Sequence, residues 1–175
     1  MVNYFELYGL PLHFRPDQAL VKRKFYELSR QFHPDRFTQA GAQAIEEAEK
    51  MSALINEAYK TLKDEDATIQ YLLKLHSMLE DEEKYSLPPD FLMEMMELNE
   101  AVSDYEMNPE SASREEAIHA LKSHVDTIQQ ELWALAKRYE QGDHSKELWM
   151  EVKDCYFRRK YLLRIQERIA KFATP

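Results

Sequence analysis

Three consecutive residues, His33-Pro34-Asp35, carry the chemical groups that stand out most clearly in the sequence. An imidazole and a carboxylate two residues apart can act as acid and base, or they can hydrogen-bond with a partner protein. Catalysis would need a nucleophile or a phosphate-binding loop, and we find no convincing nucleophile and only 3 Gly in 175 residues. We therefore expect no catalytic residue. His33 and Asp35 should contact a partner, and Pro34 should restrict their loop.

Two amphipathic helices should hold this loop. Apolar residues recur at helical spacing on both sides of it. Before the loop these are Val21, Phe25, Leu28 and Phe32, and after it they are Ala48, Met51, Ile55, Ala58 and Leu62. Pro16-Asp17 is a plausible start for the first helix, and a third amphipathic stretch covers residues 66–76. The two helices should pack antiparallel, with the His33-Pro34-Asp35 loop at their exposed tip.

A cationic strip leads along the first helix toward this loop. At 100° per residue, its members share a solvent face beside the apolar stripe. They are Lys22, Arg23, Tyr26 and Arg30. Such a strip can steer the molecule toward an acidic surface. The alternative is a helix-capping turn beside a solvated charged face.

The second half of the chain follows an acidic run and a proline-containing break, Ser86-Leu87-Pro88-Pro89-Asp90. We expect a domain over residues 1–76, an acidic linker over 77–88 and a second domain over 89–175. Helical patterns over 89–107, 113–141 and 144–172 predict an antiparallel three-helix bundle, because short connections join long helices. One predicted seam comprises Ile118, Leu121, Val125, Ile128, Leu132 and Leu135, and the other Leu148, Val152, Cys155, Leu162, Ile165 and Ile169.

The first bundle helix has more apolar residues than one core face needs. Phe91, Met95, Leu98, Val102 and Tyr105 fall on one side. The remaining apolar residues, Leu92, Met93 and Met96, fall on the side of Glu97, Glu100 and Asp104. Exposed apolar residues ringed by acids indicate a protein-binding patch, and the unbranched thioether of Met suits such a surface. The alternative is that this side is buried against the first domain or against another helix of the bundle.

Composition excludes several other functions. A net charge of −9 argues against nucleic acid as a partner, because binding phosphates needs a concentrated basic surface. Much of the negative charge lies in residues 80–110, which carry eleven acids against one lysine.

The single cysteine, Cys155, permits no internal disulfide, and we expect it in the core. His119 and His124 are five residues apart, a poor spacing for a helical metal site, so we expect neither metal nor cofactor. Without a transmembrane-length run, a cytoplasmic protein with no membrane partner is expected. Basic residues of the last helix, including Arg158 and Arg168, should form ion pairs with the acidic helix of residues 90–106 or form a solvated face.

Three segments together resemble the J-domain family over about the first 75 residues. They are Tyr4-Phe5-Glu6-Leu7-Tyr8-Gly9-Leu10, the His33-Pro34-Asp35 loop, and Ile55-Asn56-Glu57-Ala58-Tyr59-Lys60-Thr61-Leu62. The resemblance implies that the loop and the cationic strip contact a DnaK-type ATPase and accelerate its ATP hydrolysis. The chain itself would then be an activator and no enzyme.

The whole chain resembles the HscB family, the J-type co-chaperones of iron–sulfur cluster assembly. Phe91-Leu92-Met93-Glu94, followed by Met96-Glu97-Leu98, is the most telling segment. The resemblance implies an all-α, L-shaped two-domain protein, with a J-domain and a three-helix bundle, and an HscA-like partner ATPase. It also implies that Leu92, Met93, Met96, Glu97, Glu100, Asp104 and Phe157 bind an IscU-type cluster scaffold. Two alternatives stay open: a general folding J-protein that binds unfolded clients, and a structural helical adaptor with a degenerate triplet.

Overall fold

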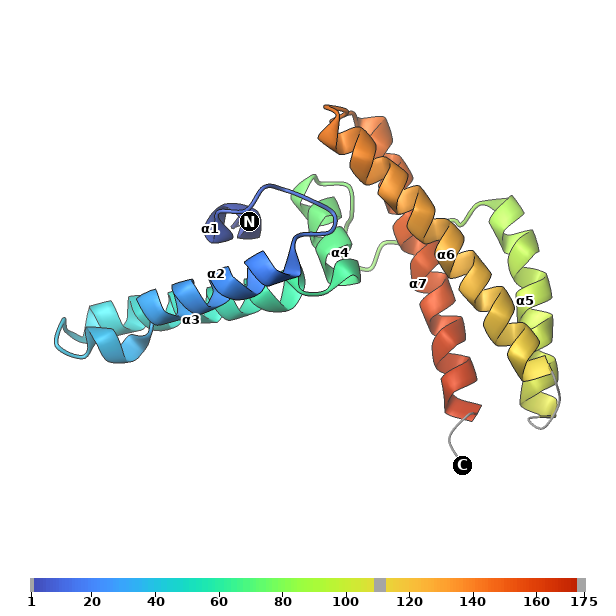
Figure 1. Cartoon of the computed structure of the whole chain (residues 1–175), viewed down its shortest axis with the longest axis horizontal. Helices are drawn as coiled ribbons and strands as arrows, with labels where there is room; N and C mark the ends of the chain where they lie inside the picture. The colour runs from blue at the N-terminus through green and yellow to red at the C-terminus, as the bar shows by residue number, and fades with distance from the viewer. Residues whose placement is uncertain (1, 109–112, 173–175) are drawn as a thin grey trace. The chain divides into compact units, whose positions relative to one another are not determined.

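The computed structural model describes residues 2–108 and 113–172, and within these ranges the chain forms seven α-helices, one short 3-10 helix and no strand (Figure 1). It divides into two compact units, Met1–Ser77 and Met78–Pro175. None of the helices within the described ranges is both long and apolar enough to cross a membrane. The predicted all-α class, with a helical hairpin followed by a three-helix bundle, is confirmed.

The first unit is built on a hairpin of α2 (Gln18–Gln31) and α3 (Ala42–Leu62), which pack against each other (Figure 1). Asp17 caps α2, since its carboxylate accepts hydrogen bonds from the backbone N–H groups of Ala19 and Leu20. The rings of Phe25 and Tyr59 stack across the hairpin at 4.3 Å between centroids. The 3-10 helix η1 (Pro34–Phe37) lies in the connection between α2 and α3, so the predicted tip position is confirmed.

Two short helices, α1 (Tyr4–Tyr8) and α4 (Glu65–Leu75), close the other end of the hairpin. The Tyr8 hydroxyl donates to the Ile55 carbonyl oxygen at 2.7 Å, which fixes α1 on α3. The Tyr4 and Tyr71 rings stack at 4.4 Å, and the Tyr71 hydroxyl accepts from the Tyr4 backbone N–H at 2.9 Å. These buried aromatic contacts keep the hairpin closed far from its tip, which leaves the tip side chains for other contacts.

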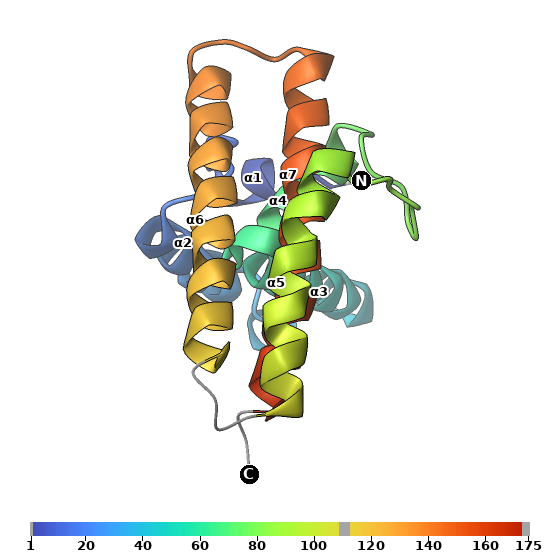
Figure 2. The same cartoon turned by 90° about the vertical axis from the view of Figure 1, so that its right-hand side faces the viewer.

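The second unit is a three-helix bundle of α5 (Pro89–Met107), α6 (Ser113–Glu140) and α7 (Lys146–Phe172) (Figure 2). The predicted α7 seam, from Leu148 to Ile169, is buried, and Cys155 is part of it. Ile118 is an exception in the α6 seam, because 42% of it is exposed. It borders an open groove between α6 and α7 that Gln166 and Ala170 also line.

Polar contacts fix the register between α5 and α7. The Asn99 side-chain amide donates to the Tyr161 hydroxyl at 2.9 Å, and Arg168 pairs with Glu106 at 3.0 Å. In both pairs the partners are 62 residues apart, so α5 and α7 run parallel. The expected pairing of α7 cations with the acidic helix is thus confirmed for Arg168.

Arg158 has different partners from those expected. Its guanidinium pairs with Glu131 of α6 and, at 2.7 Å, with Asp154 of its own helix. The hydrogen bond from Arg158 holds the pKa of the Glu131 carboxyl below its ordinary value. On the α5 side the guanidinium lies over the ring of Phe91, 5.9 Å from its centroid, so its contact with that helix is with an aromatic ring.

A capped turn joins α6 to α7. The Asp143 carboxylate accepts from the Ser145 hydroxyl at 2.6 Å and from the Ser145 backbone N–H at 3.1 Å, and it pairs with Arg138 at 2.9 Å. The Ser145 hydroxyl oxygen in turn accepts from the Leu148 N–H at 3.2 Å. These hydrogen bonds, with the Ser145 hydroxyl contributing most, lower the pKa of Asp143 to about 2.

Candidate partner-binding surfaces

The tip of the hairpin presents the predicted His33-Pro34-Asp35 side chains to solvent. His33 begins η1, where its Nδ1 accepts from the Asp35 backbone N–H at 3.3 Å and its carbonyl accepts from the Arg36 N–H at 3.0 Å. The His33 side chain is nevertheless 58% exposed and that of Asp35 88%. Because Nδ1 is an acceptor, the proton of the neutral ring is assigned to Nε2, which is left to donate to a partner.

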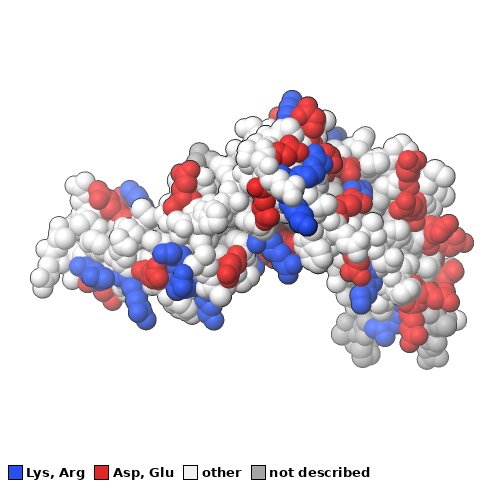
Figure 3. Space-filling view, turned by 45° about the horizontal axis from the view of Figure 1, so that its top comes forward, with Lys and Arg blue, Asp and Glu red and all other residues white. Residues whose placement is uncertain are grey.

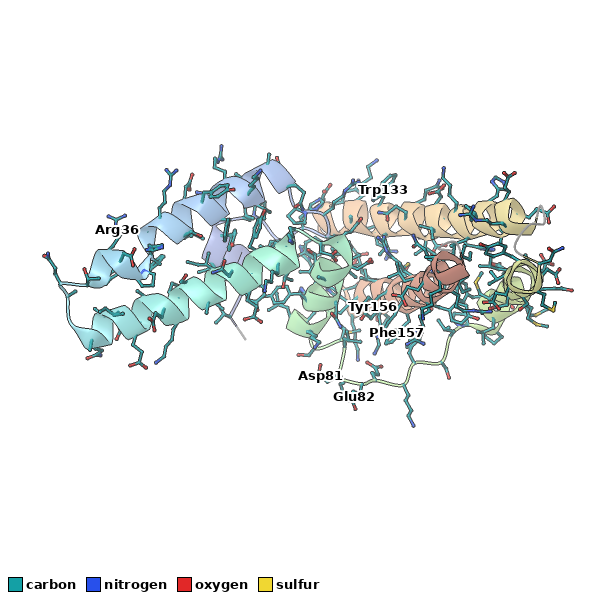
Figure 4. All side chains as sticks on the ribbon, turned by 90° about the horizontal axis from the view of Figure 1, so that it is seen from below. Arg36, Asp81, Glu82, Trp133, Tyr156 and Phe157 are labelled. Atoms are coloured by element: carbon teal, nitrogen blue, oxygen red, sulfur yellow. The ribbon has the colours of Figure 1, made fainter. Side chains whose placement is uncertain are left out.

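Arg36 belongs to this tip, although sequence reasoning did not single it out. Its Nη1 donates to the carbonyl oxygen of Arg30 in the last turn of α2, at 3.2 Å, and so holds η1 against that helix end. Tyr26, Arg30, His33 and Arg36 line one shallow hollow beside the loop. Figure 4 shows Arg36 at the far end of the hairpin. The sequence offered one signal for this role: a basic residue directly after the triplet can interact with the C-terminal end of the preceding helix, where the backbone carbonyls carry partial negative charge.

The predicted cationic strip lies along α2 with every member exposed. Its residues are Lys22, Arg23, Tyr26 and Arg30. Arg23 is 3.9 Å from Glu27 with both side chains largely in water, so this ion pair contributes little and leaves the guanidinium accessible. Lys and Arg side chains line one edge of the hairpin in the space-filling view (Figure 3). The strip and the triplet therefore form a continuous, partly basic face.

The apolar patch on α5 is on the surface of the bundle, so the alternative that another helix of the bundle buries these residues is wrong. Leu92, Met93 and Met96 are 42%, 68% and 70% exposed, whereas Met95 and Leu98 on the opposite side are 1% exposed. The three predicted acids, Glu97, Glu100 and Asp104, are exposed as well. Acidic side chains gather over α5 in Figure 3. One helix thus presents a buried face to its bundle and an apolar, acid-rimmed face to solvent.

Phe157 lies on α7 at the level of the N-terminal half of α5. It precedes by one turn Tyr161, whose hydroxyl accepts from Asn99, and Met95 precedes Asn99 by one turn in the same way. Leu92 precedes Asn99 by seven residues, which is almost two full turns, and so lies on the same side of α5 as Asn99. The register of α5 and α7 therefore places Phe157 along the part of α5 that carries Leu92 and Met96.

One face of the Phe157 ring is already covered from within the chain. The ring of Tyr85 stacks on it at 4.4 Å between centroids with an angle of 3° between planes. Figure 4 shows Phe157 on the side of α7 that faces the preceding linker. Sequence analysis missed Tyr85, because nothing in the pattern of residues 77–88 distinguishes an anchored aromatic residue from a mobile one.

No group of three or more His, Cys, Asp or Glu residues that could hold a metal ion occurs within residues 2–108 and 113–172. His124 is 3.8 Å from Glu94 across α5 and α6, and His119 is exposed elsewhere on α6. Cys155 is 2% exposed, and burial raises the pKa of its thiol to about 12. The thiol is therefore protonated near neutral pH.

The hairpin with its exposed tip, closed by α1 and α4, defines the class as a J-domain protein. A family model, the DnaJ domain, matches residues 3–71. A second, the HSCB C-terminal oligomerisation domain, matches residues 87–170. Together the two models cover both units.

Curated relatives and solved structures extend this similarity over the full length. The chain is 35% identical to a co-chaperone protein HscB homolog from Vibrio atlanticus, over 96% of this chain and 95% of that protein. It is 30% identical to the solved structure of chaperone HscB from Vibrio cholerae, with a TM-score of 0.70 over 97% of this chain and 96% of that one. Human co-chaperone HscB is 31% identical with a TM-score of 0.77, over 100% and 84% of the two chains. The chain belongs to the HscB family of co-chaperones.

Proposed function

We propose that this co-chaperone is a cytoplasmic adaptor with two binding surfaces. Its J-domain engages a DnaK-type, HscA-like ATPase and accelerates ATP hydrolysis there. Its bundle binds an IscU-type iron–sulfur scaffold and delivers it to that ATPase, which aids cluster maturation and transfer. The chain performs no bond-breaking step of its own, because the nucleotide is bound and hydrolysed by its partner.

The tip supports the first half of the proposal. His33 Nε2 and the Asp35 carboxylate offer a donor and an acceptor at the end of a rigid hairpin, with η1 fixing their spacing. The exposed cations of α2 supply electrostatic steering toward an acidic ATPase surface. A pre-formed tip loses little conformational entropy on binding, which favours a specific contact from a small surface.

The α5 patch supports the second half and is the observation that carries the proposal. A helix that exposes Leu92, Met93 and Met96 while burying Met95 has a second apolar face with no partner within the described chain. An acidic rim of Glu97, Glu100 and Asp104 selects a partner with basic residues around an apolar centre. The family relationship supports the cluster scaffold as that partner.

Two variants separate the surfaces in one experiment. His33→Gln should abolish stimulation of the partner ATPase and leave scaffold affinity unchanged. The combined change Leu92→Ala, Met93→Ala and Met96→Ala should weaken scaffold binding and leave ATPase stimulation without scaffold unchanged. Loss of both activities in either variant, with the fold intact by circular dichroism, would contradict the two-surface proposal.

Capture of partners from the native lysate distinguishes the remaining functions. The proposal predicts recovery of one cluster scaffold and one DnaK-type ATPase, with the triple α5 variant losing only the scaffold. A broad mixture of unfolded proteins would indicate a general folding J-protein instead. Recovery of neither partner would indicate a structural adaptor with a non-functional triplet.

A further inference from the structure

The last residues before α5 are anchored to α7. Tyr85 stacks face to face on Phe157, and its hydroxyl donates to the Asp154 carboxylate at 2.9 Å. Two residues earlier, Glu83 pairs with Lys153 at 2.5 Å, with side chains only 23% and 18% exposed. A freely moving linker makes no such contacts, so residues 83–85 are a fixed part of the bundle surface.

The Tyr85 hydroxyl remains a donor under physiological conditions. Burial, assisted by the hydrogen bond to Asp154 and the negative charge of that carboxylate, raises its pKa to about 12. The hydrogen bond and the ring stack therefore act together to hold the aromatic side chain in one orientation. Both Tyr85 and Phe157 remain half-buried, so part of each ring is still in contact with solvent.

The position of this aromatic pair gives it a role. Phe157 lies one turn before Tyr161, which hydrogen-bonds to Asn99, and the exposed Met96 and Leu92 lie about one and two turns before Asn99 on α5. Tyr85 covers one face of the Phe157 ring, and its hydroxyl is held by Asp154, three residues earlier on α7. A partner side chain that reaches Phe157 therefore meets a ring that Tyr85 supports.

We propose that Tyr85 is part of the scaffold-binding surface, where it forms with Phe157 an aromatic wall beside Leu92 and Met96. This inference rests on the proposed scaffold function and deepens it. This aromatic wall would accommodate an apolar side chain of the partner that packs beside Leu92 and Met96. Basic residues next to that side chain would form ion pairs with Glu97 and Glu100. Tyr85 acts both by contact and by fixing the orientation of Phe157.

The test measures the Kd of the purified IscU-type scaffold for four forms of the full chain by isothermal titration calorimetry. Tyr85→Ala should raise the Kd about 10-fold, because it removes a stacked anchor at the interface. Tyr85→Phe keeps the ring and should stay within about 3-fold of wild type. Lys84→Ala, an exposed neighbour in the same linker, is the matched control and should leave the Kd unchanged.

Coupling separates direct action from general disturbance. If Tyr85 acts with Phe157, Tyr85→Ala should add less than about 3-fold to the Kd in a Phe157→Ala background. If Tyr85→Ala lowers the melting temperature of the bundle, Tyr85→Leu is measured instead, because Leu keeps an apolar side chain over Phe157. The Kd of the Tyr85→Leu variant should then be at least about 3-fold higher than that of wild type.

Three results overturn the inference. An unchanged Kd for Tyr85→Ala and Tyr85→Leu would show that the stack is only structural. A lower Kd for Tyr85→Ala would show that Tyr85 blocks the surface. Full additivity with Phe157→Ala would show that the two rings act separately. Failure of the triple Leu92, Met93 and Met96 variant to weaken binding would instead defeat the proposed scaffold function itself, so the two failures are distinguishable.

Discussion

Met95 and Met96 are adjacent residues of the same type with opposite environments, which makes them a matched pair for testing the α5 patch. Met95 is 1% exposed inside the bundle, and Met96 is 70% exposed. Fully burying a Met side chain stabilises a protein by about 1.5–3 kcal/mol. With roughly a third of its surface out of water, Met96 contributes about 0.5–1 kcal/mol to folding, and the better helix propensity of Ala offsets part of the loss.

The two alanine substitutions should therefore separate folding from binding. Met95→Ala leaves a cavity and should lower the free energy of unfolding of the bundle by about 2–5 kcal/mol. Met96→Ala should lower it by less than about 1 kcal/mol and raise the Kd for the scaffold about 10-fold, equivalent to about 1.4 kcal/mol. Urea denaturation followed by circular dichroism gives the first quantity, and calorimetric titration gives the second.

If Met96→Ala destabilised the bundle by more than about 2 kcal/mol, the side chain would be part of a core, and its exposure would be misjudged. If the bundle stayed stable and the Kd were unchanged, the exposed methionines would have no role in recognising the scaffold.

Other predictions follow from single contacts. In His33→Asn the amide Oδ1 takes the place of Nδ1 as acceptor for the Asp35 N–H, so the variant should keep the η1 cap, which is worth about 1 kcal/mol. It should nevertheless lose ATPase stimulation as fully as His33→Gln. Normal stimulation by the Asn variant would mean that the imidazole matters only as a cap. The pKa of Asp143, lowered to about 2, lies below its unfolded value of about 3.9, so its stabilising contribution is complete above about pH 4 and is lost as the pH falls toward 2. Thermal melts across this range should therefore fall more steeply for wild type than for Asp143→Asn, and parallel curves would contradict the assignment. The buried thiol of Cys155, with its pKa raised to about 12, should react with iodoacetamide at pH 8 only after denaturant is added, and rapid labelling of the native protein would contradict its burial.

Helical periodicity was sufficient to predict the fold because each helix follows one dominant apolar stripe. The pattern over 89–107 predicted the bounds of α5 that the structure shows, and Asp17 marked the start of α2. Ile118 departs from its seam because the bundle leaves a groove open between α6 and α7, and periodicity in one helix contains no information about how widely its neighbours cover it.

The surfaces were predictable only in part. Periodicity placed Leu92 and Met96 off the core face of α5, but it could not show whether another helix covers that side. That depends on how three helices pack. The pairing of Tyr85 with Phe157 joins a linker to a helix 72 positions later in the chain and depends on the register between elements. Arg36 was missed because its role, a hydrogen bond to the Arg30 carbonyl, exists only once the loop is folded against α2.

The central claim is that the tip and the α5 patch act together in one adaptor, and the rate of ATP hydrolysis by the partner ATPase tests it most directly. That rate should be measured with the chain alone, with scaffold alone and with both. We predict that the chain stimulates hydrolysis and that scaffold increases this stimulation further. His33→Gln should remove both effects, and the triple Leu92, Met93 and Met96 variant should remove only the increase caused by scaffold. No stimulation by the wild-type chain, or an equal scaffold effect in the triple variant, would contradict the account.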